Sequence, residues 1–194
     1  SPLRGFFNVH NCLAAATVAR GLGIPSEIIC KGLAQADCVP GRFEFVQAGQ
    51  PFPIIVDYAH TPDALQKTML IAKGVSEGRL ITVMGCGGDR DAGKRPIMGR
   101  AAAHLSDTLI ITNDNPRTEE PAMIAQAIVD GFKDEDTYWL QLRVILDRGQ
   151  AIQAAMEEAE QGDVVLIAGK GHEDYQIIGN QVLPFDDRQQ AREA

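Results

Sequence analysis

Short runs of branched apolar residues alternate with longer amphipathic stretches along most of this chain, and no other feature constrains the fold as strongly. From Pro40 onward, strands are predicted at 43–48, 54–57, 80–84, 108–112, 143–145 and 164–168. Helical periodicity fills most of the gaps, at 62–73, 96–104, 121–132, 149–160 and from 187 to the C-terminus. The pattern predicts an α/β fold with a mainly parallel sheet flanked by helices.

The segment before Pro40 has a different organisation. An alanine-rich helix is predicted at 8–22, where Gly21 and Gly23 end it, and a second helix runs from Pro25-Ser26 to about residue 36. No strand precedes this helical pair, so the start is abrupt for a natural N-terminus. We therefore predict two parts, 1–39 and 40–194, and expect the chain to be a fragment of a longer protein.

Charge and cysteine content narrow the class of protein. The 26 acidic and 18 basic side chains give a formal net charge of −8, which argues against a surface that coats nucleic acid. The four cysteines match no zinc-ribbon spacing, so we expect reduced thiols and no metal site. No apolar run approaches the roughly 20 residues of a membrane helix, and the first residues lack the basic-then-apolar order of a signal peptide. We expect a cytoplasmic monomer that handles small molecules and contacts neither nucleic acid nor membrane.

Polar and glycine-rich segments follow four of the predicted strands. They are Asp57 with His60, the loop 85–94, the tetrapeptide 114–117 and the loop 169–173. In an open parallel sheet, ligands collect at the carboxyl ends of the strands, where loop amides and helix N-termini converge. We therefore expect these four loops to share one crevice.

The glycine-rich loop 85–95 invites two phosphate-binding interpretations, and both fail. Gly88 to Lys94 fits the start of a Walker A loop, but Arg95 stands where Ser or Thr would hold magnesium, and two acids lie inside the cradle. A dinucleotide fingerprint fails because Arg90 replaces its third glycine. The loop is better interpreted as a turn that presents Arg90.

Two motifs together suggest a receptor for a zwitterion. In Asp114-Asn115-Pro116-Arg117, the arginine offers a planar fork of donors that can grip a carboxylate at two points. In the loop 168–173, Glu173 can neutralise an ammonium group. The plainer alternative makes Asn115-Pro116 a turn, Arg117 a surface charge and Glu173 a solvated acid.

Six motifs occur in the order seen in the Mur ligases: 8–11, 41–44, 57–62, 85–96, 114–121 and 169–176. The chain resembles most the MurE branch, which adds meso-diaminopimelate to UDP-N-acetylmuramoyl-L-alanyl-D-glutamate, and the resemblance covers nearly all of it. That family has an N-terminal UDP-binding domain, a central ATPase domain and a C-terminal Rossmann-like domain. The resemblance implies that 1–39 is the helical end of the central domain and that 40–194 is the Rossmann-like, amino-acid-binding domain.

The resemblance also implies an activity. Mur ligases carry out an ATP-dependent amide ligation in peptidoglycan precursor synthesis, a step of cell-wall biogenesis, in which a carboxylate is phosphorylated and an amine then attacks. ATP and magnesium are the implied cofactors. The family's P-loop, magnesium-binding acid and modified lysine would lie upstream of Ser1, so the chain alone is expected neither to catalyse nor to bind a cofactor tightly.

Site residues follow from the matched motifs. Those implied to hold meso-diaminopimelate are Arg90, Asp114, Asn115, Pro116, Arg117, Gly169 and Glu173. Relatives that add lysine typically lack an arginine at the Arg117 position, because lysine has no second carboxylate, so Arg117 is the main reason to expect diaminopimelate.

A second set is implied to lie on the ATP side: Asn8, Asn11, Arg42, Asp57 and His60. The asparagines would lie near the adenine and Asp57 near the ribose. Arg42 and His60 would lie near the phosphates and act in catalysis, with Arg42 delivered by closure about a hinge at Pro40-Gly41. The plainer alternatives are helix capping by the asparagines and a structural hydrogen bond by His60.

Two other functions remain open from the sequence. One is a MurE-like protein that has lost catalysis and serves in a larger assembly. The other is an autonomous Rossmann-like module that binds a nucleotide or acts as an oxidoreductase, for which saturable NAD binding would be the sign.

Overall fold

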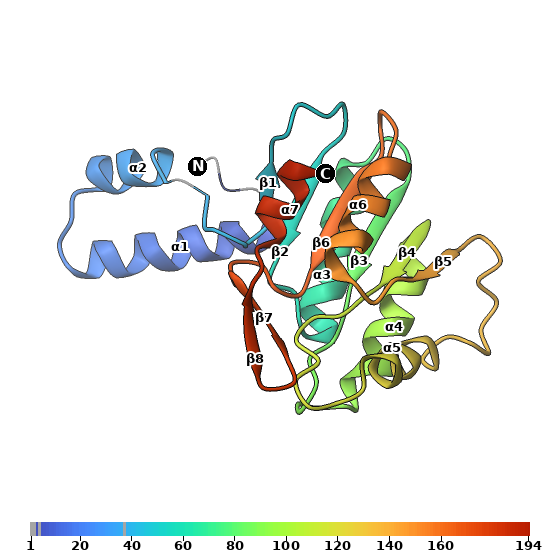
Figure 1. Cartoon of the computed structure of the whole chain (residues 1–194). Coiled ribbons are helices and arrows are strands. Elements are labelled where there is room, and N and C mark those ends of the chain that lie inside the picture. The colour runs from blue at the N-terminus through green and yellow to red at the C-terminus, as the bar shows by residue number, and fades with distance from the viewer. Residues whose placement is uncertain (1–2, 4, 37) are drawn as a thin grey trace.

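A six-stranded sheet with helices on both faces forms the centre of the computed structural model, which describes residues 3, 5–36 and 38–194 (Figure 1). The strand order is β1-β2-β6-β3-β4-β5, and all neighbours pair in parallel except the edge strand β1. The strands are β1 (Glu44–Val46), β2 (Ile54–Asp57), β3 (Leu80–Met84), β4 (Thr108–Ile111), β5 (Gln141–Val144) and β6 (Val164–Ala168). The predicted α/β architecture is confirmed.

Helices divide the core into two layers. On one face lie α3 (Pro62–Val75), α4 (Lys94–Leu105) and α5 (Pro121–Val129); on the other lie α6 (Arg148–Glu158) and α7 (Asp187–Glu193) (Figure 1). Strand residues alternate between the layers, so that Ile55 packs in the first core and Val56 in the second. Every residue of β3 and β6 is buried, as expected for central parallel strands covered on both faces.

The N-terminus of α3, the helix before β3, is capped as the sequence predicts. The Thr61 side chain accepts a hydrogen bond from the Ala64 amide at 3.3 Å, and Pro62 occupies the first turn of α3.

The direction of the chain along the sheet reverses once. From β2 to β5 it moves toward one edge with α3, α4 and α5 on the first face, and α6 then returns across the opposite face to place β6 between β2 and β3. A crevice forms outside the carboxyl ends of the strands where such a reversal occurs. The loops after β2, β3, β4 and β6 meet there.

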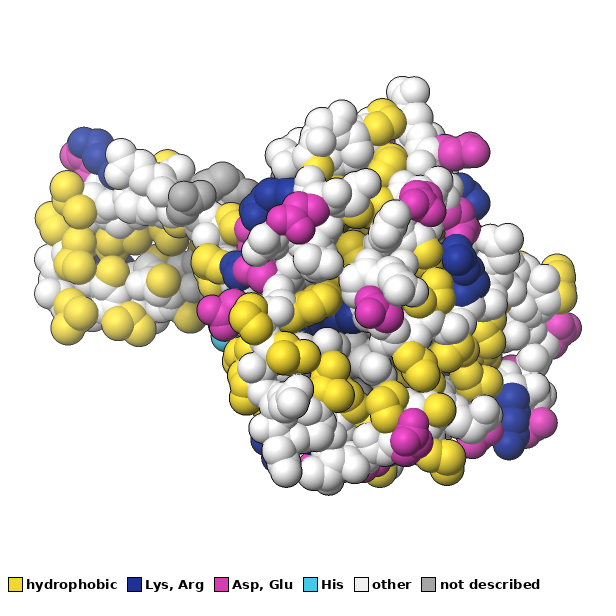
Figure 2. Space-filling model, viewed as in Figure 1, with side chains coloured by type: hydrophobic (Ala, Val, Ile, Leu, Met, Phe, Trp, Pro, Cys, Tyr) yellow, Lys and Arg dark blue, Asp and Glu magenta, His cyan; other side chains and the backbone are white. Residues whose placement is uncertain are grey.

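Helices α1 (Phe6–Gly21) and α2 (Ser26–Ala34) pack on each other and project away from the sheet (Figure 1). No residue of α2 is buried. Apolar side chains remain exposed on this pair, as Figure 2 shows, among them Val9, Leu13, Val18, Leu22, Ile24 and Ile28. The change of organisation near Pro40 is visible in the structure, while the domain boundary itself stays a prediction.

Several strands differ from the sequence prediction, and β1 and β4 are shorter than the predicted 43–48 and 108–112. Strand β5 begins at Gln141 and not at 143, and all its residues are exposed, so its hydrophobic pattern is weak. The hairpin of β7 (Tyr175–Ile178) and β8 (Gln181–Pro184) was missed. Its signal was present, because Gly179-Asn180 joins two short apolar runs, and Gly179 has a φ of 58° that suits the turn.

A fully buried ion pair joins the end of the chain to the sheet. Arg148 at the start of α6 donates from Nε and Nη2 to the two carboxylate oxygens of Asp187, at 2.7 and 2.8 Å. Its remaining donors reach the carbonyls of Asn113 at 3.2 Å and Ala168 at 3.1 Å. Burial disfavours the charged form, but the charge and hydrogen bonds of Asp187 hold the pKa of Arg148 above its ordinary value. The pair therefore fixes the carbonyls of Asn113 and Ala168, which directly precede the crevice segments 114–117 and 169–173.

Replacing Asp187 by Asn should destabilise the domain by about 3–5 kcal/mol, because the substitution leaves the Arg148 charge buried without a counter-charge. Denaturant unfolding measures this loss. The matched control is Glu27→Gln, which removes an exposed pair with Lys31 and should cost less than about 1 kcal/mol. Equal effects of the two substitutions would contradict the structural role of the buried pair.

Candidate functional site

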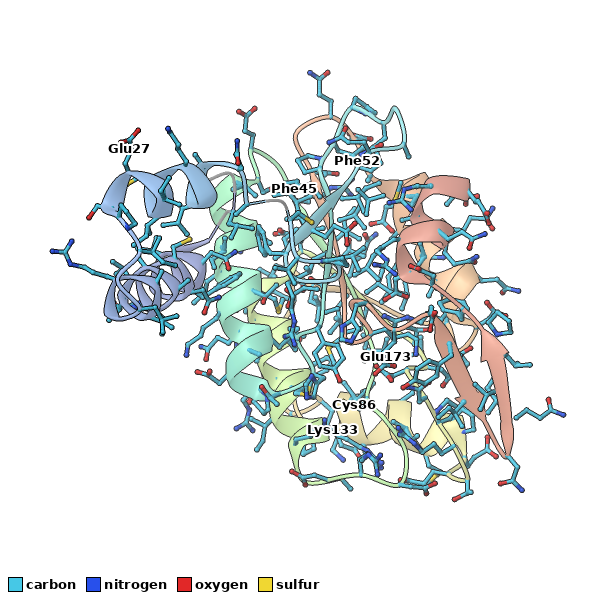
Figure 3. The ribbon with its side chains drawn as sticks, turned by 90° about the vertical axis from the view of Figure 1, so that its left-hand side faces the viewer. Glu27, Phe45, Phe52, Cys86, Lys133 and Glu173 are labelled. Atoms are coloured by element: carbon cyan, nitrogen blue, oxygen red, sulfur yellow. The ribbon has the colours of Figure 1, made fainter. Side chains whose placement is uncertain are left out.

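A cavity of about 330 Å³ lies where the four loops meet. It is lined by Tyr58, His60, Gly85, Cys86, Gly87, Arg90, Lys94, Asp114, Asn115, Arg117, Gly169, Glu173 and Tyr175. Figure 3 shows two of these residues, Cys86 and Glu173, at the same end of the sheet. All lining residues fall between Tyr58 and Tyr175, so the 40–194 part forms the cavity by itself.

The structure brings together the residues implied to hold the amino acid, with one exception. Arg90, Asp114, Asn115, Arg117, Gly169 and Glu173 all line this first cavity. Pro116 does not; it is buried with its carbonyl against Gly88, where an added Cβ would lie only 1.9 Å from the Pro116 oxygen. Pro116 therefore shapes the turn and does not form the cavity wall.

Arg117 is held in an unusual backbone conformation. Its φ of 53° lies in the left-handed region, which costs a non-glycine residue roughly 1–2 kcal/mol. The β7–β8 hairpin stabilises it, because the Arg117 amide donates to the Ile177 carbonyl at 3.1 Å and the Gly179 amide donates to the Arg117 carbonyl at 2.7 Å. The side chain is also anchored, since Nη1 donates to the Gly88 carbonyl at 2.8 Å. Such strain concentrates at functional sites.

Asn115 and Glu173 are joined by hydrogen bonds. Asn115 Nδ2 donates to Glu173 Oε2 at 3.0 Å, although 58 residues separate them in the sequence. A second donor to the same oxygen is the buried Lys170 ammonium, at 3.2 Å. Asn115 is itself buried. The plainer view of Glu173 as a solvated acid does not fit these contacts.

Asp114 is a buried carboxylate on the cavity wall. Burial raises its pKa, the nearby charges of Arg148 and Lys170 lower it, and Glu173 raises it again, with a net increase above the ordinary value of 3.8. Gly169, with a φ of 120°, allows the close packing: an added Cβ would lie 2.8 Å from Asp114 Oδ2. The glycine therefore makes room for the carboxylate.

Ionic contacts hold the loop 85–94 against the segment after β4. Arg95 pairs through both terminal nitrogens with Glu119, at 2.9 and 2.8 Å, and Thr118 donates to Asp89 at 2.8 Å. The glycines serve the same packing, because a Cβ on Gly85 would lie 2.2 Å from the Thr112 carbonyl. Gly85 is therefore required for the close approach of these two segments.

Cys86 faces the cavity as a protonated thiol. Burial raises the pKa of Cys86 to about 12, and Lys94 opposes this effect only in part. The thiol is therefore no nucleophile at neutral pH.

A second cavity, of about 420 Å³, lies between α1, α3 and the turn before β1. Asn8, Asn11, Arg42 and Asp57 line it together with Lys67 and Thr68. The structure thus gathers most of the residues implied for the ATP side. Asn11 Nδ2 donates to Asn8 Oδ1 at 3.1 Å, and Gly5 is the residue at the N-cap of α1.

Asp57 stabilises the turn that carries Arg42. Its carboxylate accepts the Phe43 amide at 2.7 Å and the Thr68 hydroxyl at 3.0 Å, and Phe43 has a φ of 49°. Burial raises the pKa of Asp57, whereas these hydrogen bonds lower it, with a net increase. Gly41 is packed against the backbone of Gly171 and His172, so a hinge would have to act N-terminal to Gly41.

Tyr58 stands between the two cavities. Its ring lines the first cavity, and Arg42 of the second cavity lies over the ring at 4.6 Å. His60 lines the first cavity and not the second, so it is separated from the other residues implied for the ATP side. The cause is local: His60 Nδ1 is 2.8 Å from the Tyr58 carbonyl, and Lys94 donates to the His60 carbonyl at 2.7 Å.

The first cavity can bind a ligand that carries both charges. Arg90, Lys94 and Arg117 supply cations, and Asp114 and Glu173 supply anions. Within the described ranges, no group of three or more His, Cys, Asp or Glu side chains could hold a metal ion. Nor does that part of the chain contain a helix long and apolar enough to cross a membrane.

Sequence analysis missed Tyr58, Tyr175 and the buried Lys170 at this site. Lys170 and Tyr175 lie in or beside the motif 169–176, so their position was available, but nothing local marks a lysine as fully buried. Arg148 and Asp187 carried no signal, because their contact spans 39 residues.

Fold and site together define an α/β domain whose strand ends form a polar pocket lined by side chains of both charges. The model of the Mur ligase, glutamate ligase domain matches residues 41–171, and the chain belongs to this family.

Individual relatives support this family assignment. The chain is 48% identical over its whole length to the UDP-N-acetylmuramoyl-L-alanyl-D-glutamate–2,6-diaminopimelate ligase of Solibacter usitatus, and 50% identical to that of Synechocystis. It covers 38% of each of these relatives. A solved structure of a ligase of the same name matches the whole chain with a TM-score of 0.76 and 40% identity, and the match covers 39% of that structure.

A more distant structure shows the fold alone. The UDP-N-acetylmuramate-alanine ligase of Thermotoga maritima is 20% identical with a TM-score of 0.67, over 98% of this chain and 37% of that one.

Replacing Asp114 by Asn should stabilise the unliganded domain at neutral pH. Because the folded-state pKa of Asp114 is raised, the folded protein binds more protons than the unfolded chain above pH 3.8, and stability falls as pH rises through this window. The variant has no carboxyl group at this position and therefore does not lose this stability. The difference in melting temperature between the variant and the parent should accordingly be larger at pH 7 than at pH 4.

The control is Asp136→Asn, a substitution of the same type at an exposed position outside the cavity. A difference for Asp114→Asn that is flat or shrinks with pH would contradict the assigned direction.

Proposed function

We propose that this chain is the C-terminal, amino-acid-binding part of an ATP-dependent ligase that adds meso-diaminopimelate to UDP-N-acetylmuramoyl-L-alanyl-D-glutamate in peptidoglycan precursor synthesis. One observation carries the proposal: Arg117 and Glu173 line one cavity of about 330 Å³ although they come from different loops. The names of the relatives support the same substrate pair.

The pocket's charges match the end of diaminopimelate that does not react. That end has one ammonium and one carboxylate group on the same carbon. The guanidinium groups of Arg117 and Arg90 would hold the carboxylate, and Glu173 with Asp114 would hold the ammonium. L-lysine carries an ammonium group there but no carboxylate, so Arg117 would have no ligand carboxylate to bind. Selection of diaminopimelate over L-lysine would therefore depend on Arg117.

The second cavity is the proposed nucleotide side. It offers the amides of Asn8 and Asn11 for a base and the Arg42 guanidinium for phosphate charge. Related folylpolyglutamate synthases have been solved with ADP or with AMPPNP and manganese. ATP with magnesium is accordingly the proposed cofactor set, and the phosphate loop and metal ligands would come from outside residues 1–194.

The proposed chemistry requires both cavities to work together. In the proposed reaction the D-glutamate side-chain carboxylate would accept the terminal phosphoryl group of ATP, with ADP as the leaving group. The amine of diaminopimelate would then attack the acyl carbon and displace phosphate, losing a proton as the amide forms. The residues of this chain hold the far end of the amino acid, so that the reacting amine is presented in a fixed direction. Arg42 over the Tyr58 ring lies where the two cavities adjoin, which suits a cation that serves phosphate charge once the domains close.

Arg117→Ala tests the proposal. The parent chain should bind meso-diaminopimelate more tightly than L-lysine, and the variant should lose about tenfold or more in affinity for diaminopimelate, because a charge-assisted pair is removed. Calorimetry on the 194-residue chain measures both ligands. Binding by the isolated chain is expected because its own residues form the cavity.

Arg100→Ala is the matched control, since Arg100 is an exposed arginine on α4 that pairs with Glu135 outside the cavity. It should bind both ligands as the parent does. Equal affinity of the parent for the two amino acids, or an unaffected Arg117→Ala variant, would remove the assigned role; no binding by the parent would contradict a pocket complete within this chain.

A further inference from the structure

Lys170 is the most completely buried cation at the site, and the proposed function gives it no task. Its side chain is 0% exposed, in the loop directly after β6. A buried ammonium group is costly unless each of its donors finds a partner. Its partners therefore indicate what the residue does.

Those partners are all at the amino-acid cavity. The Lys170 ammonium donates to Asn115 Oδ1 at 3.0 Å and to Glu173 Oε2 at 3.2 Å. It also lies 5.5 Å from the centre of the Tyr175 ring, a distance at which the ring face attracts a cation. Asn115, Glu173 and Tyr175 all line the cavity.

Lys170 fixes the orientation of the Asn115 amide. Asn115 Oδ1 faces two donors, the Lys170 ammonium and the Ile177 amide at 2.9 Å. An amide nitrogen cannot accept from either donor, so the oxygen must lie on this side. Asn115 Nδ2 is then directed to Glu173 Oε2 at 3.0 Å.

Glu173 is consequently held through one of its two oxygens. Oε2 receives hydrogen bonds from both Lys170 and Asn115, whereas Oε1 has no hydrogen-bond partner in the part of the chain that the structure describes. The side chain is partly exposed to the cavity, at 17%. Oε1 is therefore the oxygen left for a ligand.

We propose that Lys170 is a positioning residue that sets the pocket's specificity for an ammonium group, by holding Glu173 through Oε2 and presenting Oε1 to the amino acid. The inference rests on the proposed function and extends it. Lys170 contributes no direct contact to the ligand. Without it, the Glu173 carboxylate loses its counter-charge beside Asp114, and the Asn115 amide loses one of the two donors that orient it.

The test compares two ligands in the parent chain and in Lys170→Met. The ligands are meso-diaminopimelate and 2-aminopimelate, which lacks only the distal amino group, and calorimetry gives both dissociation constants. The parent should favour diaminopimelate by about tenfold or more, because one charge-assisted contact distinguishes the ligands. Lys170→Met should reduce this preference to about threefold or less and leave the affinity for 2-aminopimelate nearly unchanged.

A merely structural role for Lys170 gives a different result. General loosening of the pocket would weaken both ligands by the same factor and keep the preference for the amino group, which would overturn the inference while leaving the proposed function intact. A parent that does not distinguish the ligands, or binds neither, would contradict an ammonium-selective pocket complete within this chain and would overturn this inference with it. Lys133→Met, an exposed lysine, is the matched control and should behave as the parent.

Tyr175→Leu decides the question if Lys170→Met does not fold. This substitution removes the ring beside the ammonium group at a half-buried position and retains the lysine. The preference for diaminopimelate over 2-aminopimelate should fall in the same direction by about threefold. An unchanged preference in Tyr175→Leu would count against the positioning role.

Discussion

The buried pair of Arg148 and Asp187 is the interaction on which the site depends. It joins α6 to α7, and its remaining donors reach the carbonyls of Asn113 and Ala168. These carbonyls immediately precede Asp114 and Gly169, two residues of the cavity wall. Because an unpaired charge in the core is so costly, loss of either partner would also disturb the carbonyls from which the two loops begin. One interaction thus couples the stability of the fold to the geometry of the pocket.

The pocket is otherwise built by opposing constraints. Arg117 is held in a left-handed backbone conformation by the β7–β8 hairpin, and Asp114 is buried against its tendency to stay solvated. Both features reduce the stability of the unliganded domain, and both place an ionisable side chain in the wall of the first cavity. The buried cations Lys170 and Arg148 offset part of this cost. The arrangement is typical of sites in which stability is traded for binding.

Sequence analysis predicted much of the site because the fold itself gathers the motifs. The loops after β2, β3, β4 and β6 were expected to meet, and parallel strands place their carboxyl ends at one edge. Two positions lie apart from the residues with which the sequence analysis grouped them. Pro116 packs behind Gly88, and His60 turns toward the first cavity, because contacts from other loops decide where each side chain lies. The division of the crevice by Tyr58 into two cavities was not foreseen.

The sequence by itself determined the alternation of strands and helices, the mainly parallel sheet and the family, because hydrophobic periodicity and ordered motifs are local properties of the chain. Only the tertiary structure decided which charges are buried and what they contact. The bond from Asn115 to Glu173 spans 58 residues and that from Arg148 to Asp187 spans 39, and a charged side chain looks the same in sequence whether it is solvated or enclosed. Lys170 owes its place at the site to packing that no local pattern encodes.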